Sequence, residues 1–247
     1  MTLAVTVLGS SGMYATVERA CAGYLVEIDD FILLLDAGAG TWRNLLTHVD
    51  YRDLDGILLS HRHPDHTSDV LQAFHARHYG PDGPLEPIPF WAPAEAIELV
   101  SNYSNESRSG FDFHTITEES ALEIGAARVS FVRMAHPPET LGVRIEHESR
   151  IFAYSSDTGE GADFKSLAGG SSVFVCEATL QDADEIWAGH MRASQAAHVA
   201  TLAGTQQLVL THLPPERDHE LSLSEARAVT DARVQLAYDG LRLEVGS

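Results

Sequence analysis

The sequence predicts an α/β fold in one domain that spans residues 1–247. Short apolar, β-branched segments of strand length alternate along the chain with segments that have helical apolar spacing. No linker divides the 247 residues into halves, and 44% of them are hydrophobic, which is enough for a substantial buried core. We therefore expect sheets covered by helices.

Strands are predicted where apolar runs stop at turn residues. Residues 2–8 form the first, which ends at GSSG (9–12), and residues 22–28 and 31–35 form a hairpin around Asp29-Asp30. The GSSG loop could offer N–H groups to a phosphate, but we interpret it as a turn. The other expected strands are residues 56–59, 88–91, 128–135, 141–147, 150–154, 172–176, 207–211, 233–237 and 241–245.

Helices are predicted where apolar residues recur three to four positions apart, as Val70, Leu71 and Phe74 do. The expected helices are residues 41–49, 67–79, 94–103, 193–203 and 222–230. A Gly/Pro-rich loop at residues 80–89 follows the second of them.

Two pairs of segments resemble each other. FILLLDAGAG (31–40) resembles IFAYSSDTGEG (151–161), and GILLSH (56–61) resembles QLVLTH (207–212), in the same order along the chain. A duplicated half-domain would explain these pairs, but chance also produces matches of this length.

Charge and cysteine content restrict the partners and the compartment. The chain has 36 acidic and 16 basic residues, a formal net charge of −20, and the basic residues form no run, so a large nucleic acid would be repelled. Two cysteines cannot build a disulfide framework, and the N-terminus lacks a signal peptide pattern. No segment approaches the ~20 apolar residues of a membrane span. We expect a cytoplasmic protein without a membrane partner.

The segment SHRHPDH (60–66) follows a predicted strand and is rich in metal-binding side chains. His61, His63 and Asp65 alternate and therefore project to one side, and His66 follows as the chain turns into a helix. Imidazole and carboxylate are ligands that zinc prefers. The simplest interpretation is two ions, one bound by the first two histidines and one by Asp65 and His66. The alternative, a solvated polar loop, is disfavoured by the density of these residues.

Three distant residues are candidates for the remaining ligands. His136, Asp157 and His212 are each the first metal-competent residue after an apolar strand. Each could be an ordinary loop residue when taken alone, but with the cluster they form a consistent set.

These residues resemble those of a known superfamily. SHRHPDH matches the HxHxDH signature of the metallo-β-lactamase fold, and the resemblance covers nearly the whole chain. It implies an αββα sandwich of two mixed sheets flanked by helices, with two divalent metal ions at one edge. We expect Zn²⁺, with Mn²⁺ or Fe²⁺ as alternatives. The resemblance implies one ion on His61, His63 and His136, a second on Asp65, His66 and His212, and Asp157 between them.

Departures from the pattern disfavour several branches of the superfamily. The commonest true β-lactamases have Cys where Asp157 stands, and flavin-partnered diiron reductases usually have Glu in place of His63. Glyoxalase II-like thioesterases append a helical domain, for which little room follows His212.

Two later segments resemble the ribonuclease Z-like phosphodiesterase branch. VFVCEATL (173–180) is similar to its His-Glu-Ala-Thr motif, with Cys176 in place of the histidine. GHMRASQAA (189–197) is similar to the His-x-Thr/Ser…Ala-Ala motif with which a helix of this branch begins. The resemblance implies that His190 contacts the scissile phosphate, that Glu177 orients His190, and that Asp65 helps to orient the nucleophile. The alternatives are a solvent-exposed His190 and a Glu177 whose carboxylate is satisfied by backbone donors.

The tRNA-gripping arm of ribonuclease Z is absent. His136 and Asp157 are 157 − 136 = 21 residues apart, which leaves room for a hairpin only. We therefore predict a catalyst that hydrolyses a small anionic phosphodiester, such as a cyclic nucleotide, in a chain that could form a homodimer as this branch often does. The alternatives are hydrolysis of a lactone or other ester, ribonuclease Z-type RNA processing, and a metal-binding module without catalysis.

Overall fold

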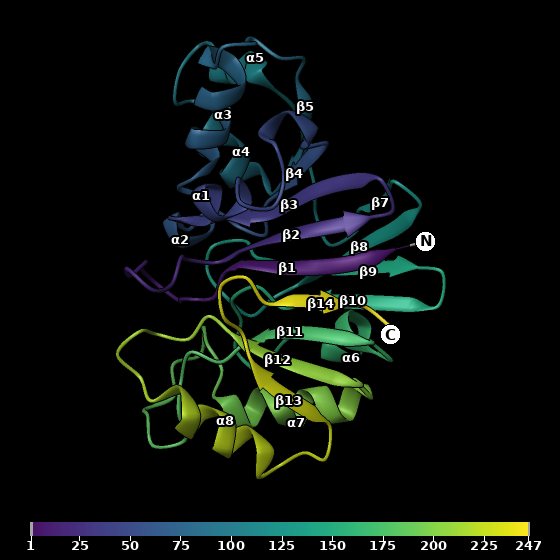
Figure 1. Cartoon of the computed structure of the whole chain (residues 1–247). Helices are drawn as coiled ribbons and strands as arrows, with labels where there is room; N and C mark the ends of the chain where they lie inside the picture. Colours follow the sequence, from purple (N-terminus) through teal and green to yellow (C-terminus); the bar gives the residue numbers. More distant parts are fainter. Residues whose placement is uncertain (1, 247) are drawn as a thin grey trace.

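The computed structural model describes residues 2–246 and shows two β-sheets packed face to face (Figure 1). Within these residues each sheet has seven strands. The strand order of the first sheet is β14 (Arg242–Glu244), β1 (Leu3–Gly9), β2 (Gly23–Ile28), β3 (Phe31–Ala37), β4 (Gly56–Leu58), β5 (Ile88–Ala92) and β6 (Phe111–Thr115). The order of the second is β13 (Arg233–Leu236), β12 (Gln207–Thr211), β11 (Val173–Glu177), β10 (Arg150–Tyr154), β9 (Leu141–His147), β8 (Ala127–Arg133) and β7 (Ala121–Ile124).

Helices cover the outer face of each sheet, as Figure 1 shows. The helices beside the first sheet are α1 (Thr41–Leu45), α2 (Pro64–Thr67), α3 (Val70–Tyr79), α4 (Ala94–Ser101) and α5 (Ser107–Gly110), with a 3₁₀ turn at Tyr51–Asp53. Those beside the second are α6 (Phe164–Ala168), α7 (Ala193–Ala203) and α8 (His219–Arg227). Both sheets mix parallel and antiparallel pairs, so the predicted αββα sandwich is confirmed.

Alternation along the strands divides the apolar side chains among three layers. On β1, Val5 and Val7 face the space between the sheets, and Leu8 packs against the helices. Between the sheets, Tyr24 contacts Tyr154 with ring centroids 4.8 Å apart. Each fully buried aliphatic or aromatic side chain of this kind stabilises the fold by roughly 1.5–3 kcal/mol, so the central layer holds the sheets together.

The two sheets repeat the same strand arrangement. In each, an antiparallel meander (β1–β3 or β8–β10) leads into parallel strands (β4–β6 or β11–β13). The segments at 31–40 and 151–161 lie at equivalent positions, on β3 and β10. The segments at 56–61 and 207–212 do not, because β4 is equivalent to β11 and not to β12. Only the first of the two sequence similarities therefore follows the repeat.

Several elements differ from the sequence prediction. Strands β6 and β7 were not expected, because both are short, lie at sheet edges and bury few of their side chains. The helix expected over residues 67–79 is α3, which begins at Val70 after the short helix α2, and the one expected over residues 41–49 ends at Leu45. The last two predicted strands, β13 and β14, lie in different sheets. Short helices α5 and α6 lack a long apolar period and were missed.

The strand directions bring several chain segments to one edge of the sandwich. Strands β10, β11 and β12 are parallel, and β8 has the same direction because β9 is antiparallel to both of its neighbours. Their carboxyl ends therefore open at a common edge, where loops carry functional side chains most often. Among residues 2–246, no helix has both the length and the apolar character needed to cross a membrane.

Candidate metal centre

The histidine-rich loop joins β4 to α2. Leu59 and Ser60 continue from the strand to His61, which is completely buried. His63 is the N-cap of α2, and Pro64 takes the first helical position, where the missing N–H is tolerated because it has no partner in a helix. Asp65 and His66 follow within the first turn of this helix.

The three distant candidates lie where the sequence predicted them, at strand ends of the second sheet. His136 follows β8, Asp157 follows β10 and His212 follows β12, and all three are buried. His212 adopts a positive φ of 55°, which is uncommon for a residue with a side chain and is found where the surrounding structure requires it.

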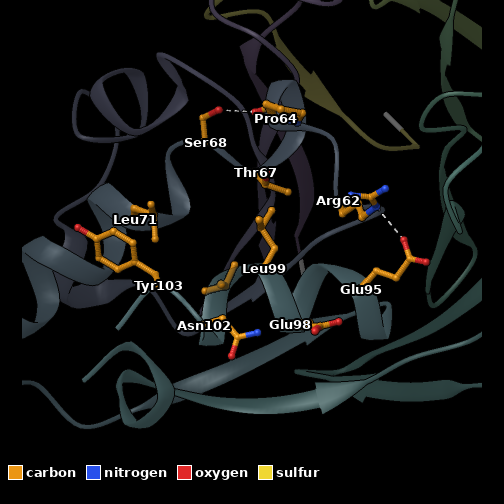
Figure 2. Close-up of a pocket in the computed structure, with 11 residues that line it drawn as sticks. Arg62, Pro64, Thr67, Ser68, Leu71, Glu95, Glu98, Leu99, Asn102 and Tyr103 are labelled. Carbon is orange, nitrogen blue, oxygen red and sulfur yellow. Dashed lines mark hydrogen bonds and ion pairs between the residues drawn. The ribbon is translucent and has the colours of Figure 1, made fainter. Parts of the chain in front are cut away.

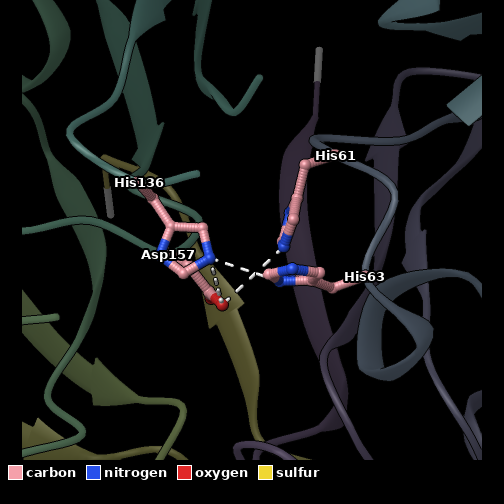
Figure 3. A group of neighbouring side chains, drawn as sticks. All are labelled: His61, His63, His136 and Asp157. Carbon is pink, nitrogen blue, oxygen red and sulfur yellow. Dashed lines mark hydrogen bonds and ion pairs between the residues drawn. The ribbon is translucent and has the colours of Figure 1, made fainter. Parts of the chain in front are cut away.

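One cluster contains His61, His63, His136 and Asp157, which point toward one another from both sheets (Figure 3). Nε2 of His136 lies 3.2 Å from Nδ1 of His63. Oδ2 of Asp157 lies 3.7 Å from Nε2 of His61 and 3.8 Å from Nε2 of His136.

A second cluster contains Asp65, His66, His212 and again Asp157. Oδ1 of Asp157 lies 3.1 Å from Nε2 of His66 and 3.3 Å from Nε2 of His212. Oδ2 of Asp65 lies 3.1 Å from Nε2 of His212. The two carboxylate oxygens of Asp157 thus face different clusters.

The clusters have the chemistry and the spacing of a cation site. Ligand atoms that surround a zinc ion at 2.0–2.2 Å in a tetrahedron are about 3.4 Å apart, close to the separations found here. Nε2 of His61, Nε2 of His66 and Oδ1 of Asp157 are buried and make no contact with hydrogen-bond geometry, although the last two lie 3.1 Å from each other. Because buried polar atoms are normally satisfied, these three atoms need a ligand, and a metal ion would provide one.

Hydrogen bonds from outside the clusters orient the imidazoles. Asp36, at the end of β3, is fully buried and accepts from Nδ1 of His66 at 2.8 Å, from the Ser60 hydroxyl at 2.8 Å and from the Tyr154 hydroxyl at 2.9 Å. Nδ1 of His136 donates to the carbonyl of Gly189 at 2.8 Å. Such contacts fix the ring orientation, which leaves Nε2 for the metal.

The loop after β1 contributes to the centre, although the sequence suggested only a turn. The Met13 N–H donates to Oδ2 of Asp65 at 2.9 Å. A Cβ atom at Gly12 would lie 2.7 Å from Nδ1 of His212, so only glycine allows this close approach. The loop therefore holds one residue of the second cluster and packs against another.

Glu177 and His190 form a buried pair beside both clusters. Oε1 of Glu177 lies 2.7 Å from Nδ1 of His190. The His190 ring centroid is 4.9 Å from that of His136 and 5.4 Å from that of His212. His190 is not the exposed helix-start residue of the alternative interpretation, because only 5% of it is exposed. Cys176 points the other way, into the apolar layer below α6, α7 and α8.

The family model of the beta-lactamase superfamily domain matches residues 32–213, a range that includes all seven residues of the two clusters. The chain belongs to the β-lactamase superfamily. It is 31% identical to protein ML1173 of Mycobacterium leprae (99% of this chain, 89% of that protein) and 30% identical to ribonuclease Z of Methanopyrus kandleri (98% of each). The crystal structure of the metallo-β-lactamase fold protein YhfI from Bacillus subtilis matches with a TM-score of 0.91 and 27% identity, over 99% of this chain and 100% of that one.

These similarities confirm the predicted superfamily and its ribonuclease Z-like branch. With clusters able to bind metal at the expected edge, the protein is a metal-dependent hydrolase of the β-lactamase fold. The hairpin of β9 and β10 occupies the space between His136 and Asp157, so the chain has no arm at this position.

The two clusters of this superfamily member differ in protonation. Burial, with His66 nearby, holds the pKa of His61 well below its ordinary value, and burial also lowers the pKa of His63 and of His136. Burial also lowers the pKa of the histidines in the second cluster, but there the nearby carboxylates raise the pKa by more. Asp157 leads this effect, which raises the pKa of His66 well above its ordinary value and that of His212 to about 9. These directions favour neutral imidazoles in the first cluster at pH 7, which can bind a cation directly, whereas the imidazoles of the second cluster must release protons to bind one.

A separate groove of about 730 Å³ lies between the histidine loop and α4 (Figure 2). Its lining includes Leu99 and Tyr103. It also includes Arg62 and Pro64, which alternate along the sequence with His61, His63 and Asp65 of the clusters. None of the seven cluster residues lines it, so this groove borders the loop without forming the reaction site.

Proposed function

We propose that this protein is a binuclear metal-dependent phosphodiesterase that hydrolyses a small phosphodiester, with a cyclic nucleotide as the candidate substrate. The observation that carries the proposal is the buried Glu177–His190 pair, 2.7 Å apart and in ring contact with both clusters. A metal centre can activate water for many substrates, but an additional buried imidazole beside it serves a substrate with an anionic reacting group.

One ion would be held by His61, His63 and His136. The other would be held by Asp65, His66 and His212, and Asp157 would contribute to both sites. Two bound divalent ions supply an activated water at neutral pH and neutralise charge on the phosphate. We propose Zn²⁺, with Mn²⁺ or Fe²⁺ as alternatives, because all three accept imidazole and carboxylate ligands.

The side chains of this protein then have separate tasks. Asp157 keeps the clusters a fixed distance apart, because its two oxygens face opposite sides. Asp65, fixed by the Met13 N–H, orients the attacking water. Nδ1 of His190 is engaged by Glu177, so Nε2 is the nitrogen that donates to a phosphate oxygen or protonates the leaving oxygen.

Charge and chain length favour a small substrate over a large RNA. Two divalent ions would bring four positive charges against two negative ones from Asp65 and Asp157, so the centre attracts anions within a protein of net charge −20. The same acidic surface repels a polyanion. We also propose that the substrate reaches the centre from solvent without a membrane or nucleic acid partner, that the protein acts in the cytoplasm, and that it forms a homodimer.

The second candidate is RNA processing, which the 30% identity to ribonuclease Z of Methanopyrus kandleri favours. Hydrolysis of a lactone or other ester is the third, and it does not need His190. The test is turnover by the metal-loaded protein of cyclic nucleotides, a chromogenic phosphodiester, a lactone and a precursor tRNA. Turnover of the small phosphodiesters alone supports the proposal, and turnover of only the lactone or only the tRNA refutes it.

A further inference from the structure

The loop between β11 and α7 carries two exposed apolar side chains beside the metal centre. Ile186 and Trp187 lie three or four residues before His190, and 55% of Trp187 is exposed. Of the three tryptophans in the sequence, Trp42 is buried and Trp91 is half-buried, so Trp187 is the one with a large exposed area.

Trp187 is held against the imidazole that the proposed mechanism uses. The backbone N–H of His190 donates to the backbone carbonyl of Trp187 at 3.0 Å, and the centroids of the imidazole and indole rings are 4.4 Å apart. The indole centroid is also 6.5 Å from the ring centroid of His136 in the first cluster. The indole therefore lies at the outer side of the reaction centre, with one part against His190 and the rest toward solvent.

The loop after β1, which contacts the second cluster, also has exposed side chains with apolar surface. Met13, whose N–H holds Asp65, has an exposed side chain, and Tyr14 next to it is also exposed. Anion-binding centres usually have polar or basic surroundings, but this one has apolar side chains on both loops. Such surroundings suit a ligand that joins an anionic group to a flat apolar one.

An exposed indole beside a phosphate-binding centre has a specific use. Nucleobases stack on aromatic side chains with a favourable energy that depends little on the base, because every base has a π-face. A sugar phosphate without a base has no π-face to stack on the indole. Trp187 would thus select nucleotides over phosphodiesters with small alkyl groups.

We propose that Trp187 is a stacking platform for the nucleobase of the substrate, which makes the substrate class a nucleoside phosphodiester. This inference rests on the proposed phosphodiesterase function and specifies it further. The contrasting role is purely structural: Trp187 would shield His190 from water, and its loss would then weaken turnover of every phosphodiester equally.

The first test is binding, measured by intrinsic tryptophan fluorescence of the metal-loaded protein. Adenosine monophosphate should quench the emission of the wild type and of Leu202→Ala, a control at an exposed position on α7, and ribose 5-phosphate should not. The quenching should disappear in Trp187→Phe, because this variant lacks the indole whose emission reports the stacking. Equal responses to both ligands, or quenching that persists in Trp187→Phe, would overturn the proposal.

The second test is turnover of two chromogenic diesters, thymidine 5′-(p-nitrophenyl phosphate) and methyl p-nitrophenyl phosphate. Trp187→Ala should raise KM for the thymidine ester about tenfold, and the effect on the methyl ester should be at least fivefold smaller. Trp187→Phe should keep most of the wild-type KM. An equal loss with both esters would mean that Trp187 only shields His190. If the wild type cleaves neither ester, the phosphodiesterase proposal fails, and the fluorescence result alone decides whether the indole stacks on a base.

Discussion

Oε1 of Glu177 lies 2.7 Å from Nδ1 of His190, and backbone N–H groups hold the carboxylate from other sides. Thr158 donates to Oε1 at 2.7 Å, and Thr179 and Met191 donate to Oε2 at 3.2 and 3.3 Å. The sequence left open whether Glu177 is a carboxylate satisfied by the backbone or one that orients His190. The structure shows both sets of contacts, because backbone N–H groups and the His190 ring bind the same carboxylate, and the role of Glu177 in orienting His190 stays a prediction.

His190→Ala should therefore bind metal as the wild type does but lose most of its rate. Removing a general acid or a charge-stabilising donor costs about 10²–10³ in kcat. Steady-state kinetics with a chromogenic phosphodiester, alongside metal analysis of the same sample, measures both effects. Full activity in this variant would remove His190 from the mechanism.

Glu177→Gln should have a smaller effect than His190→Ala, because the amide oxygen can still accept from His190. The amide NH2 would then face the Thr179 and Met191 N–H groups, so thermal unfolding is measured alongside. We expect a lower kcat, since the charge that contacts the His190 ring is lost. Unchanged kinetics at every pH would mean that Glu177 only satisfies the backbone.

Asp157→Ala should abolish metal loading and turnover, because both clusters lose the carboxylate that they share. His63→Ala should do the same by opening the first cluster. Competition against a chromophoric chelator gives the metal affinities, and Asp112→Ala, which changes an exposed carboxylate on β6, is the matched control. Wild-type metal binding in Asp157→Ala would contradict the shared position.

Asp36→Asn should weaken metal binding about 10–100-fold, although Asp36 faces neither cluster directly. The amide keeps the shape of the carboxylate but loses the charge that holds Nδ1 of His66. Metal affinity and thermal unfolding should be measured together, so that a folding defect is recognised. A variant with normal folding and unchanged metal affinity would show that this contact does not tune the second cluster.

The metal-free protein should lose stability as the pH rises from about 6.5 to 9. His212 has a pKa of about 9 in the folded chain and about 6.5 when unfolded, so the folded state binds more protons in this range. His66, whose pKa is also raised, acts in the same direction. The imidazoles with lowered pKa values change stability only below pH 6.5.

Denaturant unfolding of the metal-free protein at several pH values measures this effect, which is about 3 kcal/mol at most for His212. The metal-loaded protein is the control, and its stability should not fall in the same range because metal-bound imidazoles are neutral and have no second proton to release. Constant stability of the metal-free protein from pH 6.5 to 9 would refute the assigned charges.

The seven cluster residues could be predicted because each lies within a few residues of a strand end or in the segment that joins β4 to α2. The strand directions of an α/β sandwich bring such positions to one edge. The order of strands and polar residues along the sequence was therefore sufficient to predict that His136, Asp157 and His212 meet. Their roles as ligands remain a prediction of the resemblance, whereas their proximity is an observation.

The surrounding contacts could not be predicted in the same way. Asp36 stands at a strand end within the repeated segment DAGAG, and this position was the one feature of the sequence that pointed to it. Its hydrogen bond to His66 could not be predicted, because it depends on how α2 turns back toward β3. The contact of Gly12 with His212 joins residues 200 positions apart and leaves no local pattern. Edge strands β6 and β7 were missed because they bury one face at most.

Metal stoichiometry tests the central claim most directly. The metal-free chain should be titrated with Zn²⁺ and the complex weighed by native mass spectrometry, with Asp157→Ala measured in parallel. Two ions for each wild-type chain, and fewer in the variant, are the result that two clusters joined by one carboxylate predict. A folded wild-type chain that binds one ion, or none, would contradict it.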